Sequence, residues 1–255
     1  MLSAALAQNQ GDPSMNIYVI NLAKNTERMA SMDAQLKALG LEYERIEAVY
    51  GKALSKAERK AQFAAFRSYC ASGYRLYDGE IGCALSHIAI YRKMVAENVS
   101  MALVLEDDVV LDGGLKNRVE EIAKFADVAK PQVFLLSAHG VKDVDKKGVE
   151  RIRGGTCTDG YVITMLAAKI VVNANFPVVT VADRWSRWEK RYCLEMYRVW
   201  PIAVKQDNGR FGTDIDPCLF NRSKQIAHMI WARVKRPIRA IGIGLDWLYF
   251  WRYGR

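Results

Sequence analysis

The sequence predicts an α/β domain, because two hydrophobic patterns alternate along most of the chain. Largely apolar runs of strand length, such as residues 16–22 and 131–137, alternate with stretches such as residues 26–39, where apolar side chains recur every three or four positions. The order strand, helix, strand at the start is that of a βαβ unit. A further run, residues 101–105, has no polar alternation, which is typical of a strand buried on both faces.

The size and composition favour one large domain with an appendage. The chain has 255 residues, of which 51% are hydrophobic and 25% charged, and no apolar run is long enough for a membrane-spanning helix. The first residues lack the basic start and the long apolar core of a secretory signal. We therefore expect a disordered leader over residues 1–15, the α/β domain over residues 16–221 and a separate tail over residues 222–255.

The basic charge is concentrated in the tail. The net charge is +9, but seven basic residues and a single acid lie from Lys224 onward, which leaves a net charge of only +3 for the preceding residues. A nucleic-acid-binding groove would need a basic surface on the domain itself. The charge distribution therefore predicts that nucleic acid is not a partner.

The five cysteines indicate a reducing compartment. Their number is odd, they are widely spaced, and none belongs to a C-x-x-C pair. We therefore expect neither a disulfide framework nor a zinc site.

Each element of the first half follows from a local pattern. The helix over residues 26–39 can be capped by Asn25 or Thr26 and is ended by Gly40. The other elements expected in this half are a strand over residues 41–49, a helix over 55–73, a loop over 74–79, a helix over 80–98 and a strand over 101–111.

The second half continues the alternation. The elements expected there are a helix over residues 115–128, the strand over 131–137, a mobile loop or hairpin over 141–155, a strand over 158–165, a short helix over 167–175 and a last strand over 197–205. Pro201 is expected to break this last strand, because proline cannot donate a hydrogen bond to a neighbouring strand.

Three consecutive carboxylates, Glu106, Asp107 and Asp108, follow the buried apolar run. Sheets of this class bind ligands at the C-terminal ends of their strands, and crowded carboxylates repel one another unless a cation compensates them. Hard oxygen ligands suit Mg²⁺ or Mn²⁺. The stretch therefore suggests a metal site at Glu106 and Asp108. The alternative is a solvated acidic turn after the strand.

Several short motifs occur in a fixed order between residues 16 and 213. They are Val19-Ile-Asn-Leu22 with Glu27-Arg28, Gly79-Glu-Ile-Gly-Cys83-x-x-Ser86-His87, Ala102-Leu-Val-Leu-Glu-Asp-Asp-Val109, Gly160-Tyr-Val-Ile-Thr164, Asp183 and Pro201-x-x-x-x-Gln206. In this order the chain resembles glycosyltransferase family 25, the lipopolysaccharide and lipooligosaccharide galactosyltransferases. It departs from the family pattern at Lys24, where arginine is usual, and at Tyr50, where aspartate is common.

The resemblance implies a GT-A-type fold, which is a Rossmann-like mixed sheet flanked by helices with a metal-binding acidic motif. It also implies transfer of a sugar, usually galactose from UDP-galactose, with inversion and with Mn²⁺ or Mg²⁺ as cofactor. A divalent cation neutralises the charge that develops on the diphosphate leaving group. On this basis we expect Asp108 to bind the metal, Glu106 to bind the metal, its water or the ribose, and Asp107 to be either a structural support or a second contact with the donor.

Further residues are expected to bind the UDP-sugar donor. They are Asn21, Leu22 and Arg28 at the end of the first strand and the start of the helix that follows, Ser86 and His87 on the helix before the metal strand, and Tyr161 and Gln206 later in the chain. Arg28 could instead be a surface cation of its helix. His87 could be a packed and hydrogen-bonded core residue.

An inverting transfer also needs a general base that deprotonates the acceptor hydroxyl. Asp183 is the first candidate and Glu80 the second. Trp185 or Trp188 could stack on a sugar ring beside Asp183. The alternative role for Asp183 is to cap the helix that follows it.

The tail over residues 222–255 has an amphipathic pattern, with apolar and aromatic side chains such as Trp231 on one helical arc and basic residues off it. Such a pattern is typical of a peripheral membrane segment, although a helix packed on the domain is the alternative. The resemblance implies a lipid-anchored oligosaccharide as acceptor, at the inner face of a bacterial membrane. With a membrane-binding tail, we therefore expect a cytoplasmic protein on that face. The rival functions are a metal-dependent phosphohydrolase and a non-catalytic basic module that binds membranes or nucleic acid.

Overall fold

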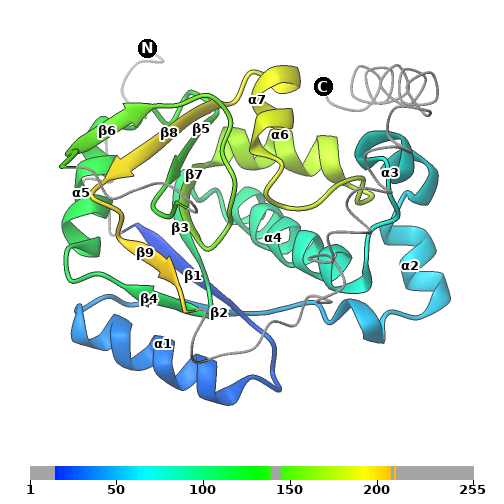
Figure 1. The fold of residues 1–255 in the computed structure, drawn as a ribbon, viewed down its shortest axis with the longest axis horizontal. Helices are drawn as coiled ribbons and strands as arrows, with labels where there is room; N and C mark the ends of the chain where they lie inside the picture. The colour runs from blue at the N-terminus through cyan, green and yellow to red at the C-terminus, as the bar shows by residue number, and fades with distance from the viewer. Residues whose placement is uncertain (1–14, 139–144, 208–209, 211–255) are drawn as a thin grey trace, which may run out of the picture.

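The structure is a computed structural model that describes residues 15–138, 145–207 and 210, and it shows helices on both sides of a central sheet (Figure 1). Seven strands of the described residues form this mixed sheet in the order β2-β1-β3-β7-β5-β8-β6. The expected Rossmann-like mixed sheet flanked by helices is therefore confirmed. A separate pair, β4 (Val109–Leu111) and β9 (Val204–Gln206), lies beside it.

Parallel pairing brings the ends of the first and third strands to one edge of the sheet. β1 (Asn16–Asn21) runs parallel to both β2 (Glu44–Glu47) and β3 (Met101–Glu106), with Ile20 opposite Glu106. The remaining strands are β5 (Gln132–Leu135), β6 (Gly148–Arg151), β7 (Gly160–Thr164) and β8 (Glu195–Trp200). β7 is antiparallel to β3 and β5, which makes the sheet mixed.

The helices cover both faces of this sheet. They are α1 (Thr26–Ala38), α2 (Lys56–Gln62), α3 (Ala65–Ser72), α4 (Asp78–Ala96), α5 (Leu115–Phe125), α6 (Met165–Asn175) and α7 (Trp185–Tyr192), with a 3₁₀ turn at Gly51–Ala53. Figure 1 shows α1 and α5 on one side of the sheet and α4 and α6 on the other. No helix among the described residues is long and apolar enough to cross a bilayer.

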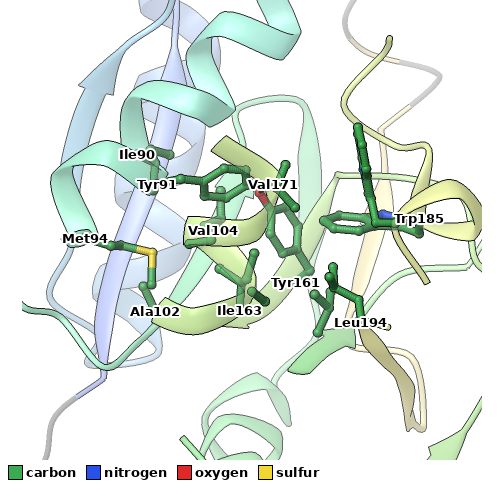
Figure 2. Close-up of a cluster of buried hydrophobic side chains, with 14 of the residues drawn as sticks. Ile90, Tyr91, Met94, Ala102, Val104, Tyr161, Ile163, Val171, Trp185 and Leu194 are labelled. Atoms are coloured by element: carbon green, nitrogen blue, oxygen red, sulfur yellow. Dashed lines mark hydrogen bonds between the residues drawn. The ribbon is translucent and has the colours of Figure 1, made fainter. Parts of the chain in front are cut away.

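Alternate residues of the central strands β1, β3, β5 and β7 enter different hydrophobic clusters. Ala102 and Val104 of β3 pack with side chains of α4, α6 and α7, as Figure 2 shows for part of this cluster. Leu103 and Leu105 face the opposite side, where α1 and α5 supply the contacts. A strand covered on both faces needs apolar residues at every position, which explains its uninterrupted hydrophobic run.

The helix expected over residues 55–73 is two helices. Phe63 has an extended backbone and forms a bridge with Val178, and the amide of Ala64 donates to the carbonyl of Val178 at 3.0 Å. These contacts with a segment far along the chain end α2 and begin α3. Helical periodicity on both sides of Phe63 concealed the break.

The strand expected over residues 101–111 is also interrupted. β3 ends at Glu106, Asp107 and Asp108 form a turn, and β4 leaves to pair with β9. Pro201 separates β8 from β9, as expected. Part of the segment expected as a loop or hairpin forms β6, which pairs with β8. The expected leader and the tail over residues 222–255 lie almost wholly outside the described residues.

A close backbone contact fixes the loop that follows β2 against α4. A Cβ atom added to Gly82 would overlap the carbonyl oxygen of Val49 and lie 2.8 Å from the amide nitrogen of Gly51. A Cβ atom on Gly51 would likewise overlap the carbonyl oxygen of Asp78. Glycine at both positions therefore allows the loop to lie directly on the helix.

Replacing Gly82 with alanine should lower the free energy of unfolding by about 1–3 kcal/mol, because backbone atoms must move to accept the methyl group. Urea denaturation measures this change. Gly113→Ala is the matched control, since a Cβ atom there meets nothing within 4 Å. Equal unfolding midpoints for the two variants would show that the contact between α4 and the loop does not constrain the fold.

Candidate functional site

An open cavity lies where β1 and β3 end, bounded by the loop after β2 and by α4. Its lining includes many of the residues expected from the sequence to bind donor or metal. These are Leu22, Arg28, Ser86, His87, Glu106, Asp107, Asp108 and Gln206. The fold therefore brings together side chains that lie far apart in the sequence, from Leu22 to Gln206. Their binding roles remain predictions.

Asp107 is held by hydrogen bonds from two neighbours. The amide nitrogen Nδ2 of Asn21 donates to its Oδ2 at 2.6 Å, and Arg28 Nη1 donates to its Oδ1 at 3.2 Å. Burial raises the pKa of Asp107 even though both neighbours act to lower it. Asn21 is itself almost fully buried, and Arg45 Nε donates to its Oδ1 at 2.9 Å. Arg45 thus orients the Asn21 amide so that it supports Asp107.

Glu106 interacts with a different pair of residues, Thr158 and His87. Thr158 Oγ1 donates to its Oε1 at 2.5 Å, and His87 Nε2 lies 3.4 Å from the same oxygen. Burial would raise the pKa of Glu106, but His87 and Thr158 outweigh it and lower the pKa. Glu106 is therefore held as an ionised carboxylate. Its contact with Thr158 joins positions 52 residues apart, and we find no sequence signal that could have revealed it.

Asp108 is the carboxylate without sufficient compensation. Its Oδ1 is buried and has no hydrogen-bond partner among the described residues, and its Oδ2 lies 3.7 Å from Arg28 Nη1. Burial, followed by the negative charge of Glu106, raises the pKa of Asp108 to about 7. A buried oxygen of this kind beside a second carboxylate fits a hard divalent cation. The donor set thus agrees with the expected metal role of Asp108 and Glu106.

A chain of buried hydroxyl groups orients His87. Its Nδ1 is 2.7 Å from the hydroxyl of Tyr161, which is 2.6 Å from the hydroxyl of Tyr91. Tyr161 is fully buried and packs edge-on against Trp185, as Figure 2 shows. Tyr161, expected to line the donor site, does not line the cavity. It reaches the cavity only through His87.

Ser86 has both of its hydrogen-bonding functions occupied. Its hydroxyl donates to the carbonyl of Gly82 at 2.8 Å and accepts from the amide of Val49 at 2.8 Å. It therefore fastens the loop after β2 to α4, next to the glycine contact described above. Gln206 follows from the pairing of β9 with β4, which places it opposite Val109 and close to Asp108.

The two candidate bases lie near each other but do not line this cavity. Glu80 is buried and accepts hydrogen bonds from the hydroxyl of Tyr74 at 2.8 Å and the amide of Tyr77 at 2.7 Å. Burial raises the pKa of Glu80, and the charge of Asp183 adds to that rise. Asp183 is partly exposed, and Arg184 rather than Asp183 is the N-cap of α7.

The expected stacking of a sugar on Trp185 or Trp188 is wrong. Both side chains are fully buried in the hydrophobic cluster between the sheet and α7. The indole nitrogen of Trp185 donates to the carbonyl of Cys157 at 2.8 Å. A short amphipathic helix must bury its apolar face, and in α7 the two tryptophans form that face.

Some residues of the lining were not among those expected from the sequence to bind donor or metal. Tyr50 and Lys52 come from the loop after β2, and Cys83 lies on α4. Lys24 Nζ lies 4.6 Å from the ring centre of Tyr50, so the two departures from the family pattern contact each other. In the sequence, Lys24 and Tyr50 are two separate departures from the family pattern, and nothing there shows that their side chains meet. Burial and the charge of Glu106 raise the pKa of Cys83, so its thiol is protonated while no cation is bound.

Comparison with known proteins gives one family. The family model described as glycosyltransferase family 25 (LPS biosynthesis protein) matches residues 14–185. A glycosyltransferase 25 family member of Anopheles gambiae is 33% identical over 60% of this chain and 28% of its own length. Procollagen galactosyltransferase 2 of Homo sapiens is 30% identical over 62% of this chain and 27% of its own length.

One relative is named as inactive. Inactive glycosyltransferase 25 family member 3 of Homo sapiens is 31% identical over 59% of this chain and 26% of its own length. The chain thus spans little more than a quarter of the length of these relatives. Similarity of sequence alone therefore does not establish catalysis, and the geometry of the cavity has to support it.

Removing the hydroxyl of Tyr161 should be more damaging than removing that of Tyr91. Tyr161→Phe leaves both His87 Nδ1 and the Tyr91 hydroxyl without their partner, so it should lower the free energy of unfolding by about 1–3 kcal/mol. Tyr91→Phe leaves the contact between Tyr161 and His87 in place and should cost less. Urea denaturation of both variants measures the difference. An equal or smaller cost for Tyr161→Phe would contradict the described chain.

Proposed function

Because the chain belongs to glycosyltransferase family 25, we propose that it transfers a sugar from a UDP-sugar donor, UDP-galactose, to a saccharide acceptor. The observation that carries this proposal is the buried Oδ1 atom of Asp108, which has no hydrogen-bond partner among the described residues, on a residue that lines the cavity at the ends of β1 and β3. Nucleotides bind at this position in α/β folds. One relative is a named galactosyltransferase, which supports galactose as the transferred sugar.

Asp108 and Glu106 would hold a divalent cation, Mn²⁺ or Mg²⁺. When bound, such an ion offsets negative charge on a diphosphate leaving group. Asp107 does not share this task equally, because both of its oxygens already accept hydrogen bonds from Asn21 and Arg28. Asp107 instead keeps Arg28 at the cavity, where its cationic side chain can attract the diphosphate.

Several residues of the cavity lining would orient the donor. Lys52 and Arg28 place positive charge on the cavity lining, and Gln206 offers an amide beside the acidic turn. Tyr50 lies on the same lining and is 41% exposed, so its ring is available to a ligand. Leu22 contributes apolar surface. Asn21, Ser86 and Tyr161 would act by positioning Asp107, the loop and His87.

The general base would be Asp183 rather than Glu80. Inverting transfer requires a carboxylate that takes the proton of the acceptor hydroxyl while the new glycosidic bond forms and the bond to the diphosphate breaks. Glu80 has its carboxylate occupied by Tyr74 and Tyr77, whereas Asp183 is partly exposed. The acceptor would then approach from the side of Asp183 and α7.

The acceptor would be a lipid-anchored oligosaccharide. The description of the matching family names lipopolysaccharide biosynthesis, and the tail over residues 222–255 has the basic amphipathic sequence of a peripheral membrane segment. We propose that this tail holds the protein on the inner, cytoplasmic face of a bacterial membrane. Substrate and enzyme would then meet on the same surface.

Asp108→Asn should separate catalysis from stability. Loss of the metal ligand should reduce the release of UDP from UDP-galactose by at least about 100-fold in the presence of Mn²⁺ and acceptor. Because burial raises the pKa of Asp108 from 3.8 to about 7, its ionisation destabilises the fold progressively as the pH rises from about 4 to 7, and the full cost is present above pH 7. The neutral asparagine removes that cost. Metal-free Asp108→Asn should therefore be more stable than the wild type at pH 8, by about 1 kcal/mol or more.

Glu120→Gln serves as the control, since Glu120 is exposed and lies outside the cavity. It should leave both UDP release and the free energy of unfolding unchanged. Wild-type rates of UDP release by Asp108→Asn would refute the metal assignment. Release of inorganic phosphate in place of UDP would identify a phosphohydrolase instead.

A further inference from the structure

We propose that Cys83, His87 and Glu106 form a second cation site, one for a borderline-soft divalent ion such as Zn²⁺. One ligand atom from each of these residues lies within 4.8 Å of the other two. All three residues line the cavity already described, but the Asp108 side chain is not part of this group. Binding at this site does not depend on sugar transfer.

The fold brings these donors together from two elements. Cys83 and His87 are four positions apart on α4, which places both side chains on one face of the helix. Glu106 is the last residue of β3, a strand whose neighbouring residues pack in the same cluster as residues of α4. The absence of C-x-x-C pairs had argued against a zinc site, but that test could not detect a third ligand on another element.

His87 is arranged as a metal ligand is. His87 is only 2% exposed, and its Nε2 is a buried atom without a hydrogen-bond partner among the described residues. Its Nδ1 is fixed by the Tyr161 hydroxyl at 2.7 Å, which directs Nε2 toward Glu106. Metal-binding histidines are oriented by a hydrogen bond at the other ring nitrogen in the same way.

The spacing of the nitrogen and oxygen donors also fits Zn²⁺. His87 Nε2 and Glu106 Oε1 are 3.4 Å apart, which is too long for a strong hydrogen bond. Two ligands at about 2.0–2.1 Å from a tetrahedral Zn²⁺ would be separated by about 3.3–3.4 Å. Thr158 donates to the same carboxylate at 2.5 Å, as an outer-shell partner of a ligating carboxylate does.

The donor types and the local charge select the ion. Sulfur, imidazole nitrogen and carboxylate oxygen together suit Zn²⁺ better than Mg²⁺ or Mn²⁺, which prefer oxygen alone. Negative charge accumulates around Cys83 from Glu106, Asp183, Asp108 and Glu80, and a divalent cation would compensate it. Three protein ligands leave a fourth position open toward the cavity for water or a ligand. Because Glu106 is shared, Zn²⁺ bound here would compete with a cation held by Glu106 and Asp108.

Cobalt(II) titration of the full-length protein tests the site. Co²⁺ replaces Zn²⁺ in such sites, and its bond to a thiolate gives a charge-transfer absorption in the near ultraviolet. The wild type should develop this absorption up to one ion per chain and lose it when Zn²⁺ is added. Cys83→Ser should abolish the band and weaken Zn²⁺ binding by at least about 10-fold.

Two variants serve as controls. Cys193→Ser removes an exposed thiol and should leave the band intact. Asp108→Asn removes a ligand of the hard-cation site and should also retain the band. Absence of the band in the wild type would overturn the proposal and leave His87 and Glu106 as neighbouring side chains that bind no metal. A band that survives in Cys83→Ser but disappears in Cys193→Ser would overturn it as well.

Discussion

Three adjacent carboxylates at the end of a buried strand need compensation, and the organisation of the site depends on how each one obtains it. Glu106 accepts a hydrogen bond from Thr158 and lies close to His87, whereas Asp107 accepts hydrogen bonds from Asn21 and Arg28. Asp108 retains a buried oxygen without a hydrogen-bond partner among the described residues. A buried charge without a partner destabilises the folded protein. The three carboxylates therefore favour a source of positive charge inside the cavity. The proposed divalent cation, bound together with the proposed donor, would supply that positive charge.

Hydrogen bonds and close packing from neighbouring elements hold these side chains in place. Arg45 of β2 orients Asn21 at the end of β1, which in turn holds Asp107 beyond the end of β3. On the other side, Tyr91 and Tyr161 form a buried chain to His87. The loop after β2 is kept on α4 by close backbone packing at Gly82 and by Ser86. The cavity is therefore built by strands, a helix and a loop that these contacts join at one edge of the sheet.

Much of this could be predicted from sequence, because local pattern determines it. The run before Glu106 showed a strand covered on both faces, and the crowded carboxylates marked the site. Long-range contacts explain the failures. The pairing of Phe63 with Val178 divides an apparently continuous helix, and burial of Trp185 and Trp188 depends on where α7 packs. Thr158 and Arg45 gave no signal, since their roles arise only when distant strands become neighbours. Cys83 and His87 fit a packed helix equally well until Glu106 is placed beside them.

The most direct test of the central claim is a crystal structure of the protein with UDP and Mn²⁺, with the ion located by its anomalous scattering. We predict a single strong peak within coordination distance of Asp108 Oδ1, bridging the carboxylate and the diphosphate of UDP. Placement of UDP in the cavity with no ion near Asp108, or of the ion and UDP away from the ends of β1 and β3, would contradict the account.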